Sequence, residues 1–130
     1  MKMGHRAETK CLKCGETFSR SHGGGFFFHL LHCELCDDAK LIDFEALGEL
    51  HIRYVKGLSG PYCSASYDGD LYIQQHVEVE AISAADYFQG VEEFAGSCTC
   101  GGQYRFDATP RCPSCKSTEV EKAEVTVWYD

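Results

Sequence analysis

The chain contains Cys11-Leu-Lys-Cys14 and, eighteen residues further on, Cys33-Glu-Leu-Cys36. Two thiol pairs at this separation can close a tetrahedral shell of four sulfurs around one Zn²⁺ ion. A second set lies near the C-terminus, where Cys98-Thr-Cys100 is followed after eleven residues by Cys112-Pro-Ser-Cys115. Eight of the nine cysteines belong to these four pairs, so the sequence predicts two four-cysteine metal sites in each chain.

The length of the chain explains why metal sites matter to it. A chain of 130 residues buries little apolar surface, so metal ions or crosslinks carry unusual weight in stabilising its fold. No apolar segment of a secretory signal follows Met1, and no apolar run approaches the length of a membrane span. We therefore expect a cytoplasmic protein that does not enter a membrane, whose paired cysteines bind metal instead of forming disulfides.

The charges are distributed unevenly along the chain. Residues 1–22 carry a net charge of +3 and residues 34–130 a net charge of −11, which together account for the total of −8. A field of this sign repels the phosphate backbone of nucleic acids. A nucleic-acid partner is therefore disfavoured, and only the basic arm of residues 1–22 leaves it possible.

The four cysteine pairs can be combined into two sites in more than one way. Closing a short local loop costs less conformational entropy than joining the two ends of the chain. We therefore expect the two N-terminal pairs to share one ion and the two C-terminal pairs to share another. This pairing predicts three units in sequence order: an N-terminal ribbon over 1–40, a mixed middle segment over 41–97, and a C-terminal ribbon with a terminal strand over 98–130.

The cysteine pairs carry a resemblance to a known superfamily. Cys112-Pro113-Ser-Cys115 reproduces the C-P-x-C turn of the rubredoxin-like zinc ribbons, and Cys98-Thr-Cys100-Gly101-Gly102 looks like a shortened form of their first turn. The N-terminal set, in which Gly15 follows Cys14, is similar to the same superfamily. The resemblance covers about 26 residues at the front and 18 at the back. It implies a small, metal-stabilised α+β fold with two zinc ribbons flanking a mixed helix and strand segment.

Between and around the cysteines, the residue pattern predicts several elements. Apolar residues at helical spacing predict a helix over 43–57, and a capping-box-like start at Ser83 predicts a second helix that ends at Gly96. Alternating apolar residues predict strands over 71–82 and 120–129.

The run Phe26-Phe-Phe-His-Leu-Leu31 is apolar on both faces and leads directly into Cys33. Its aromatic residues favour a strand that is covered on both sides. A two-stranded ribbon cannot cover both of its own faces, so the middle segment or another chain must pack there. We take Phe26–Leu31 as the candidate contact surface for a protein partner or a homo-oligomer.

The ligand set bears on the identity of the metal. Four thiolates bind Zn²⁺ and iron with similar tetrahedral geometry. Rubredoxin-like iron centres have two Cys-x-x-Cys-Gly turns, whereas here Asp37 follows Cys36 and Lys116 follows Cys115. These departures favour two structural Zn²⁺ ions over a redox iron. Four sulfurs also leave no open position for water, so neither site is expected to be catalytic.

Three further residues have both a functional and a structural interpretation. His29 and His32 precede the second cysteine pair and could serve as alternative ligands, but a packed histidine that donates to a backbone carbonyl or to a thiolate explains them as well. Cys63 is the ninth cysteine and could be a nucleophile with His51 or His76 as its base. A buried apolar cysteine is the simpler interpretation.

Taken together, these features favour a non-enzymatic zinc protein that binds another protein, with no catalytic residues. The metal ligands we predict are Cys11, Cys14, Cys33, Cys36, Cys98, Cys100, Cys112 and Cys115. Two alternatives stay open: a nucleic-acid or transcription-associated ribbon acting through residues 1–22, and a rubredoxin-like electron-transfer protein with iron in one site.

Overall fold

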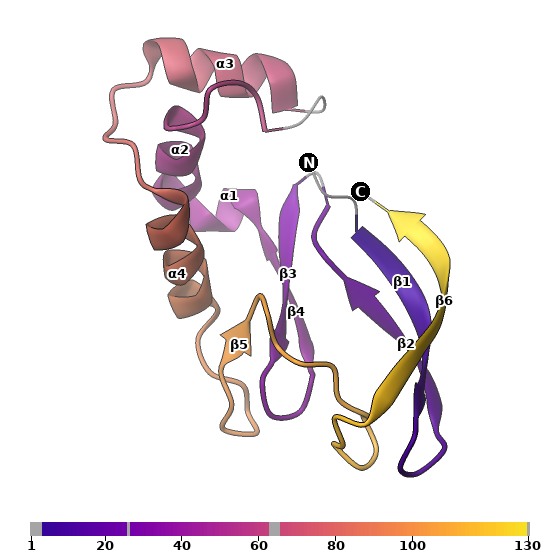
Figure 1. The fold of residues 1–130 in the computed structure, drawn as a ribbon. Coiled ribbons are helices and arrows are strands. Elements are labelled where there is room, and N and C mark those ends of the chain that lie inside the picture. The colour runs from indigo at the N-terminus through magenta and orange to yellow at the C-terminus, as the bar shows by residue number, and fades with distance from the viewer. Residues whose placement is uncertain (1–3, 26, 63–65, 130) are drawn as a thin grey trace.

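The computed structural model describes residues 4–25, 27–62 and 66–129, and for residues 122–129 it describes the backbone alone. This part of the chain forms a mixed α+β structure with two three-stranded sheets and four helices (Figure 1). Among the described residues, every helix is too short or too polar to cross a lipid bilayer.

The first sheet joins the two ends of the chain. Its strands are β1 (Gly4–Cys11), β2 (Thr17–His22) and β6 (Val120–Tyr129), in the order β2-β1-β6. All pairings are antiparallel, and β1 pairs with β6 along its whole length, from Gly4 opposite Tyr129 to Cys11 opposite Val120. The strand predicted over 120–129 is therefore confirmed, and it runs beside the first strand of the protein.

The second sheet repeats this plan. It contains β3 (Phe28–Cys33), β4 (Ala39–Asp43) and β5 (Tyr104–Arg105), in the order β4-β3-β5, again antiparallel. In each sheet a hairpin supplies the outer and central strands, and a strand from much later in the sequence adds to the other side of the central strand. The strand predicted around 26–33 is confirmed for Phe28–Cys33, whereas Phe26 lies outside the described residues.

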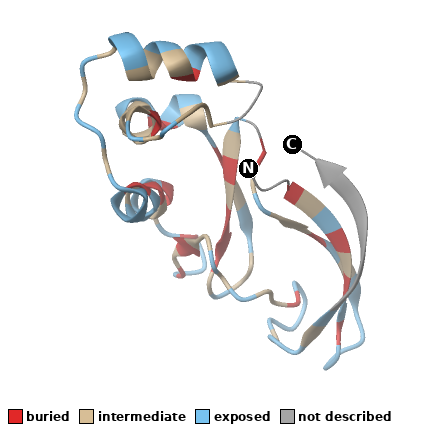
Figure 2. Ribbon diagram, turned by 45° about the horizontal axis from the view of Figure 1, so that its top comes forward, coloured by how far each residue is buried: buried red, intermediate tan, exposed pale blue. Residues whose placement is uncertain are grey.

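The two sheets are nested in the sequence. The whole second sheet lies between β2 and β6, and all four helices lie between β4 and β5. In space, the helices pack to one side of the second sheet and the first sheet lies to its other side (Figure 1). Figure 2 shows buried residues on β3, on the helix faces turned toward it, and along β1 of the first sheet.

The helices differ in part from the predicted ones. The helix expected over 43–57 is interrupted at Gly48, whose φ of 57° separates α1 (Phe44–Leu47) from α2 (Glu49–Lys56). The helix predicted from Ser83 is confirmed as α4 (Ala84–Ala95). The Ser83 hydroxyl accepts the N–H of Asp86 at 3.1 Å, as an N-cap should.

The strand predicted over 71–82 is wrong, because residues 67–76 form helix α3 (Tyr67–His76) and an extended segment follows it. Polar contacts at helical spacing override the apolar alternation. The buried Asp70 carboxylate accepts the N–H of Tyr62 and the hydroxyl of Ser66, both at 2.6 Å. One turn later, the Gln74 amide donates to the carbonyls of Val55 and Gly60. These contacts hold α3 against the end of α2.

The core lies between β3, β4 and the helices. Its buried residues come from both layers: Leu31, Cys33, Ile42, Leu47, Tyr87, Val91, Ala95, Cys98 and Tyr104. A polar group sits at its centre, where the Tyr87 hydroxyl lies 2.7 Å from His29 Nε2 and 3.0 Å from His51 Nδ1. Tyr54 stacks on the ring of Tyr87 with centroids 4.0 Å apart. Burial, and then the charge of His51, lower the pKa of His29 to about 4.

We predict that acidification destabilises the fold through His29. The pKa of His29 in the folded state, about 4, lies below its ordinary value of 6.5. Between these two pH values the unfolded state therefore binds a proton on His29 that the folded state does not bind. This contribution to stability is present above pH 6.5 and is lost as the pH falls toward 4. Between pH 6.5 and pH 5 the loss should be about 1.5 kcal/mol.

Urea unfolding of the metal-loaded protein at these two pH values measures this loss, and His29→Gln should remove it. His76→Gln is the matched control, because His76 is exposed at the end of α3 and both variants share any effect of metal loss. An unchanged pH dependence in His29→Gln would contradict the prediction.

Candidate metal centres

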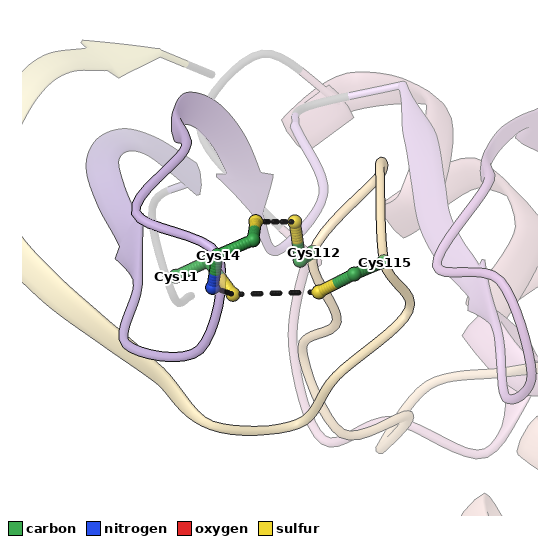
Figure 3. Close-up of side chains that lie close together, drawn as sticks. All are labelled: Cys11, Cys14, Cys112 and Cys115. Atoms are coloured by element: carbon green, nitrogen blue, oxygen red, sulfur yellow. Dashed lines mark hydrogen bonds between the residues drawn. The ribbon is translucent and has the colours of Figure 1, made fainter.

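The first cysteine cluster consists of Cys11, Cys14, Cys112 and Cys115. Cys11 is the last residue of β1 and Cys14 lies on the turn to β2, and the other two lie on the turn that precedes β6. Figure 3 shows the thiols of Cys11 and Cys14 facing those of Cys112 and Cys115. The Sγ atoms of Cys11 and Cys115 are 3.6 Å apart, as are those of Cys14 and Cys112.

The second cysteine cluster consists of Cys33, Cys36, Cys98 and Cys100. Its first pair lies on the turn between β3 and β4, and its second pair lies between α4 and β5. The Sγ atoms of Cys33 and Cys100 are 3.3 Å apart, and those of Cys36 and Cys98 are 3.6 Å apart. In both clusters, therefore, the first cysteine of one pair faces the second cysteine of the other.

The predicted pairing of the four cysteine pairs is wrong. Each cluster combines a pair from the N-terminal half with a pair from the C-terminal half, instead of two neighbouring pairs. Replacing an 18-residue loop by the 97 residues between Cys14 and Cys112 costs only about 1.5 kcal/mol more in loop-closure entropy. The pairing of β1 with β6, which extends over eight residues of β1, outweighs this difference.

All four cysteine turns, which we call knuckles, close through the same hydrogen bond, although the turn of Cys98 and Cys100 is one residue shorter than the other three. In each, the N–H after the second cysteine donates to the carbonyl of the first cysteine, at 2.9–3.0 Å. The residue that makes this bond has positive φ in every knuckle: Gly15 (82°), Asp37 (64°), Gly101 (97°) and Lys116 (64°). Gly15 and Gly101 adopt this conformation without the steric cost of a Cβ atom. Since Asp37 and Lys116 adopt it too, their difference from glycine no longer distinguishes zinc from iron.

Burial and hydrogen bonding make the thiols of each cluster unequal. The N–H of Cys14 donates to Cys11 Sγ at 3.4 Å, and this contact lowers the pKa of Cys11 to about 6. The N–H of Cys100 and then the Tyr104 hydroxyl lower the pKa of Cys98 to about 6. Burial raises the pKa of Cys36 to about 12. The hydrogen bonds to Cys11 and Cys98 thus favour their thiolate forms, and the thiolate is the form that binds a metal ion.

The geometry fits a metal ion in each cluster. The sulfur separations of 3.3–3.6 Å far exceed the length of a disulfide bond, about 2.05 Å. They approach the edge of a tetrahedron with a metal–sulfur distance of 2.3 Å, which is about 3.8 Å. Four thiolates would supply a closed shell for Zn²⁺ or iron. In the part of the chain described, the groups able to hold a metal consist of these eight cysteines alone.

Two arginines join the neighbourhoods of the two clusters. Arg20 on β2 makes a two-pronged ion pair with Asp37, with Nε–Oδ2 at 2.7 Å and a second contact to Oδ1 at 2.8 Å, and both side chains are only 7% exposed. Arg111 donates to the carbonyl of Glu34 in one knuckle and of Lys116 in another. In the sequence, these two arginines are distinguished only by their positive charge. The one indication was Asp37, which stands where glycine was expected.

Among the described residues, the remaining candidates are not members of either cluster. His29 is a packed core residue, as its structural interpretation predicts, but its partner is the Tyr87 hydroxyl and not a backbone carbonyl or a thiolate. His32 is also buried, and burial followed by the charge of Arg20 lowers its pKa to about 4. His51, proposed as a catalytic base, binds Tyr87 instead. Cys63 lies outside the described residues.

The fold and its site define a small α+β protein with two four-cysteine clusters that can bind metal. Residues 7–121 match the family described as a domain of unknown function, DUF8255, and the chain belongs to this family. The matched range runs from the middle of β1 to the start of β6 and includes all eight clustered cysteines. No curated protein and no solved structure matches the chain.

The metal content of cysteine variants should reveal the pairing. Cys14→Ser and Cys112→Ser should each lose one metal ion per chain, and the double variant should still lose only one, because both ligands serve the same cluster. Cys14→Ser combined with Cys36→Ser should lose both ions. Elemental analysis of the purified proteins measures this. Pairing of neighbouring cysteine pairs would give the reverse pattern for the two double variants.

Removing Arg20 should weaken the second cluster as well as the fold. Arg20→Gln leaves the buried Asp37 carboxylate without its partner, which should cost about 3 kcal/mol. Because Asp37 directly follows Cys36, metal should also pass faster from this cluster to a chelator. Lys10→Gln, which removes an exposed charge from the same sheet, is the control. Equal stability and equal metal loss in both variants would show that the ion pair has no such role.

Proposed function

We propose that this protein is a non-enzymatic protein-interaction module in which each cysteine cluster holds a structural Zn²⁺ ion. The observation that carries the proposal is the closed ligand set. Each cluster offers four sulfurs from two knuckles and thereby ties together strands from distant parts of the chain. Such a shell leaves no position for water or substrate, so the metal stabilises the fold and performs no chemistry.

The arrangement of each sheet supports the interpretation as a zinc ribbon. Both sheets are built in the same way. Each contains a hairpin whose turn holds one knuckle, and a third strand that follows a second knuckle. In each sheet the first strand of the hairpin is the central strand. The repeated knuckle backbone agrees with the resemblance in the sequence. We therefore propose two zinc ribbons, the second inserted within the first, and not one ribbon at each end.

The surface supports a protein partner. Residues 43–95 carry ten acidic and two basic side chains, a net charge of −8, while the rest of the chain carries ten of each sign. This acidic helical region would repel nucleic acid. It also exposes large apolar side chains, with Tyr72 62% and Phe94 53% exposed. Exposed aromatic residues of this kind are common where proteins bind one another.

The structure changes the role of the stretch Phe26–Leu31 in this proposal. His29 and Leu31 are buried against the helices, so this face of β3 is covered by the chain itself. Phe27 is 59% exposed, and Leu41 on the adjacent strand is 52% exposed. A partner would therefore contact the ends and the outer face of this strand. Because the helices already cover the face of β3 that carries His29 and Leu31, a partner would not pack on that face.

Crosslinking in the native cell tests the proposed function. The tagged chain should capture a defined protein partner, and the variant with Cys14→Ser and Cys36→Ser should lose it, because the fold depends on both metal ions. The purified protein should be colourless and contain two zinc ions. Visible absorption from iron, or nuclease-sensitive retention of nucleic acid without a protein partner, would contradict the proposal.

A further inference from the structure

A groove of about 480 Å³ lies beside the central strand of the second sheet. Among the described residues, its walls come from β3, from the turn after β2, from α4, and from the segment 106–110 that crosses to the first sheet. A second hollow of about 590 Å³ adjoins it and shares Phe88, Phe106 and Asp107 with it. The rings of Phe88 and Phe106, whose centroids are 5.2 Å apart, border both hollows, and we call the two hollows together the channel.

The backbone of β3 opens into this groove at Leu30. The N–H of Cys33 donates to Asp38 on the β4 side, whereas the N–H of Glu34 donates to Gln103 on the β5 side. Since backbone groups alternate along a strand, the N–H and C=O of Leu30 point to the β5 side. Within the described residues no backbone partner meets them there. Leu30 is only partly exposed and lines the groove.

The gap at Leu30 follows from how the neighbouring strand ends. Strand β5 is only two residues long, and it pairs with His32 and Cys33 before the chain turns at 106–107. The segment beyond the turn is held toward the first sheet, where the Ala108 carbonyl accepts from Arg20 at 3.5 Å. At the other end, the N–H of Gly25 donates to the carbonyl of Phe28. Among the described residues, the open edge therefore consists of the N–H and C=O of Leu30 alone, because the neighbouring groups on this side, those of Phe28 and His32, already have partners.

The charges around the channel are unbalanced toward the negative. Arg20 is neutralised by Asp37, and Arg105 lies between Glu34 and Glu92, at 3.5 and 3.4 Å. Asp107 is exposed and forms no ion pair with another described residue. The helical region that borders the channel carries a net charge of −8. A ligand that matches this channel carries positive charge.

We propose that this groove binds an extended segment of a partner protein, which adds to the edge of β3 at Leu30. The segment places an apolar side chain against Phe88 and Phe106 and a basic side chain beside Asp107. Addition of a strand to an open sheet edge obtains affinity from main-chain hydrogen bonds and specificity from alternate side chains. This inference rests on the proposed function and specifies the chemistry of the partner.

A synthetic peptide of sequence acetyl-Val-Lys-Phe-Lys-Val-amide is the probe, added to the ¹⁵N-labelled, metal-loaded full chain. Binding should shift the amide resonances of Leu30, Phe106 and Asp107. A peptide with glutamate in place of both lysines should bind at least about tenfold more weakly, since its charge has the same sign as the channel. The lysine peptide can also be methylated on alternate backbone nitrogens. It should bind more weakly when the methylated nitrogens are those that face Leu30, because they can no longer donate a hydrogen bond.

Two variants of equal charge change separate the groove from the general field of the protein. Asp107→Asn should weaken binding of the lysine peptide about threefold, which is typical of one exposed ion pair. Asp68→Asn removes an exposed carboxylate from α3, outside the groove, and should leave binding unchanged.

The inference is overturned if the lysine peptide shifts only resonances outside the channel, or if the methylated and unmethylated peptides all bind equally well. It is also overturned if no peptide binds. These results differ from failure of the proposed function: a partner that is captured in the cell and crosslinks to a different face leaves the interaction role intact and removes this groove as its site.

Discussion

Each cysteine cluster combines two knuckles that are far apart in the sequence, and strand pairing brings them together. The rest of the structure depends on this pairing. The ladder between β1 and β6 brings the last knuckle to the first, and the short pairing of β3 with β5 brings the third knuckle to the second. Four sulfurs can then meet although up to 97 residues separate the two pairs. Loop-closure entropy rises only slowly with length, so a modest strand pairing compensates for the longer loop.

This closure gives a nested molecule. The helices lie in the connection between β4 and β5 of the second sheet. The whole second sheet lies in the connection between β2 and β6 of the first sheet. The core belongs mainly to the second sheet and its helices, and Cys33 and Cys98 are part of it, so the second cluster borders the packed interior. The first sheet is attached through polar contacts of Arg20 and Arg111. Buried pairs such as Arg20–Asp37 need both partners, which makes the relative position of the knuckles specific.

The polar groups in the interior follow the same requirement. Tyr87 is fully buried, and its hydroxyl is satisfied by two histidines that burial keeps uncharged at neutral pH. Asp70 is buried in the first half of α3, and its carboxylate accepts hydrogen bonds from the N–H of Tyr62 and from the hydroxyl of Ser66. A buried polar atom without a partner costs more than the bond contributes, so these contacts select one arrangement of the helices.

The sequence by itself determined which residues can bind metal, where the knuckles lie, and the strands at 28–33 and 120–129. These features depend on local spacing and on the backbone freedom that a residue such as Gly15 provides. It did not determine which knuckles combine, because that depends on the ladder between β1 and β6. It also misassigned 71–82, because contacts of Asp70 and Gln74 with distant backbone favour a helix up to His76. Only the tertiary structure could decide these points, because pairing and burial join residues whose separation in sequence carries no local pattern.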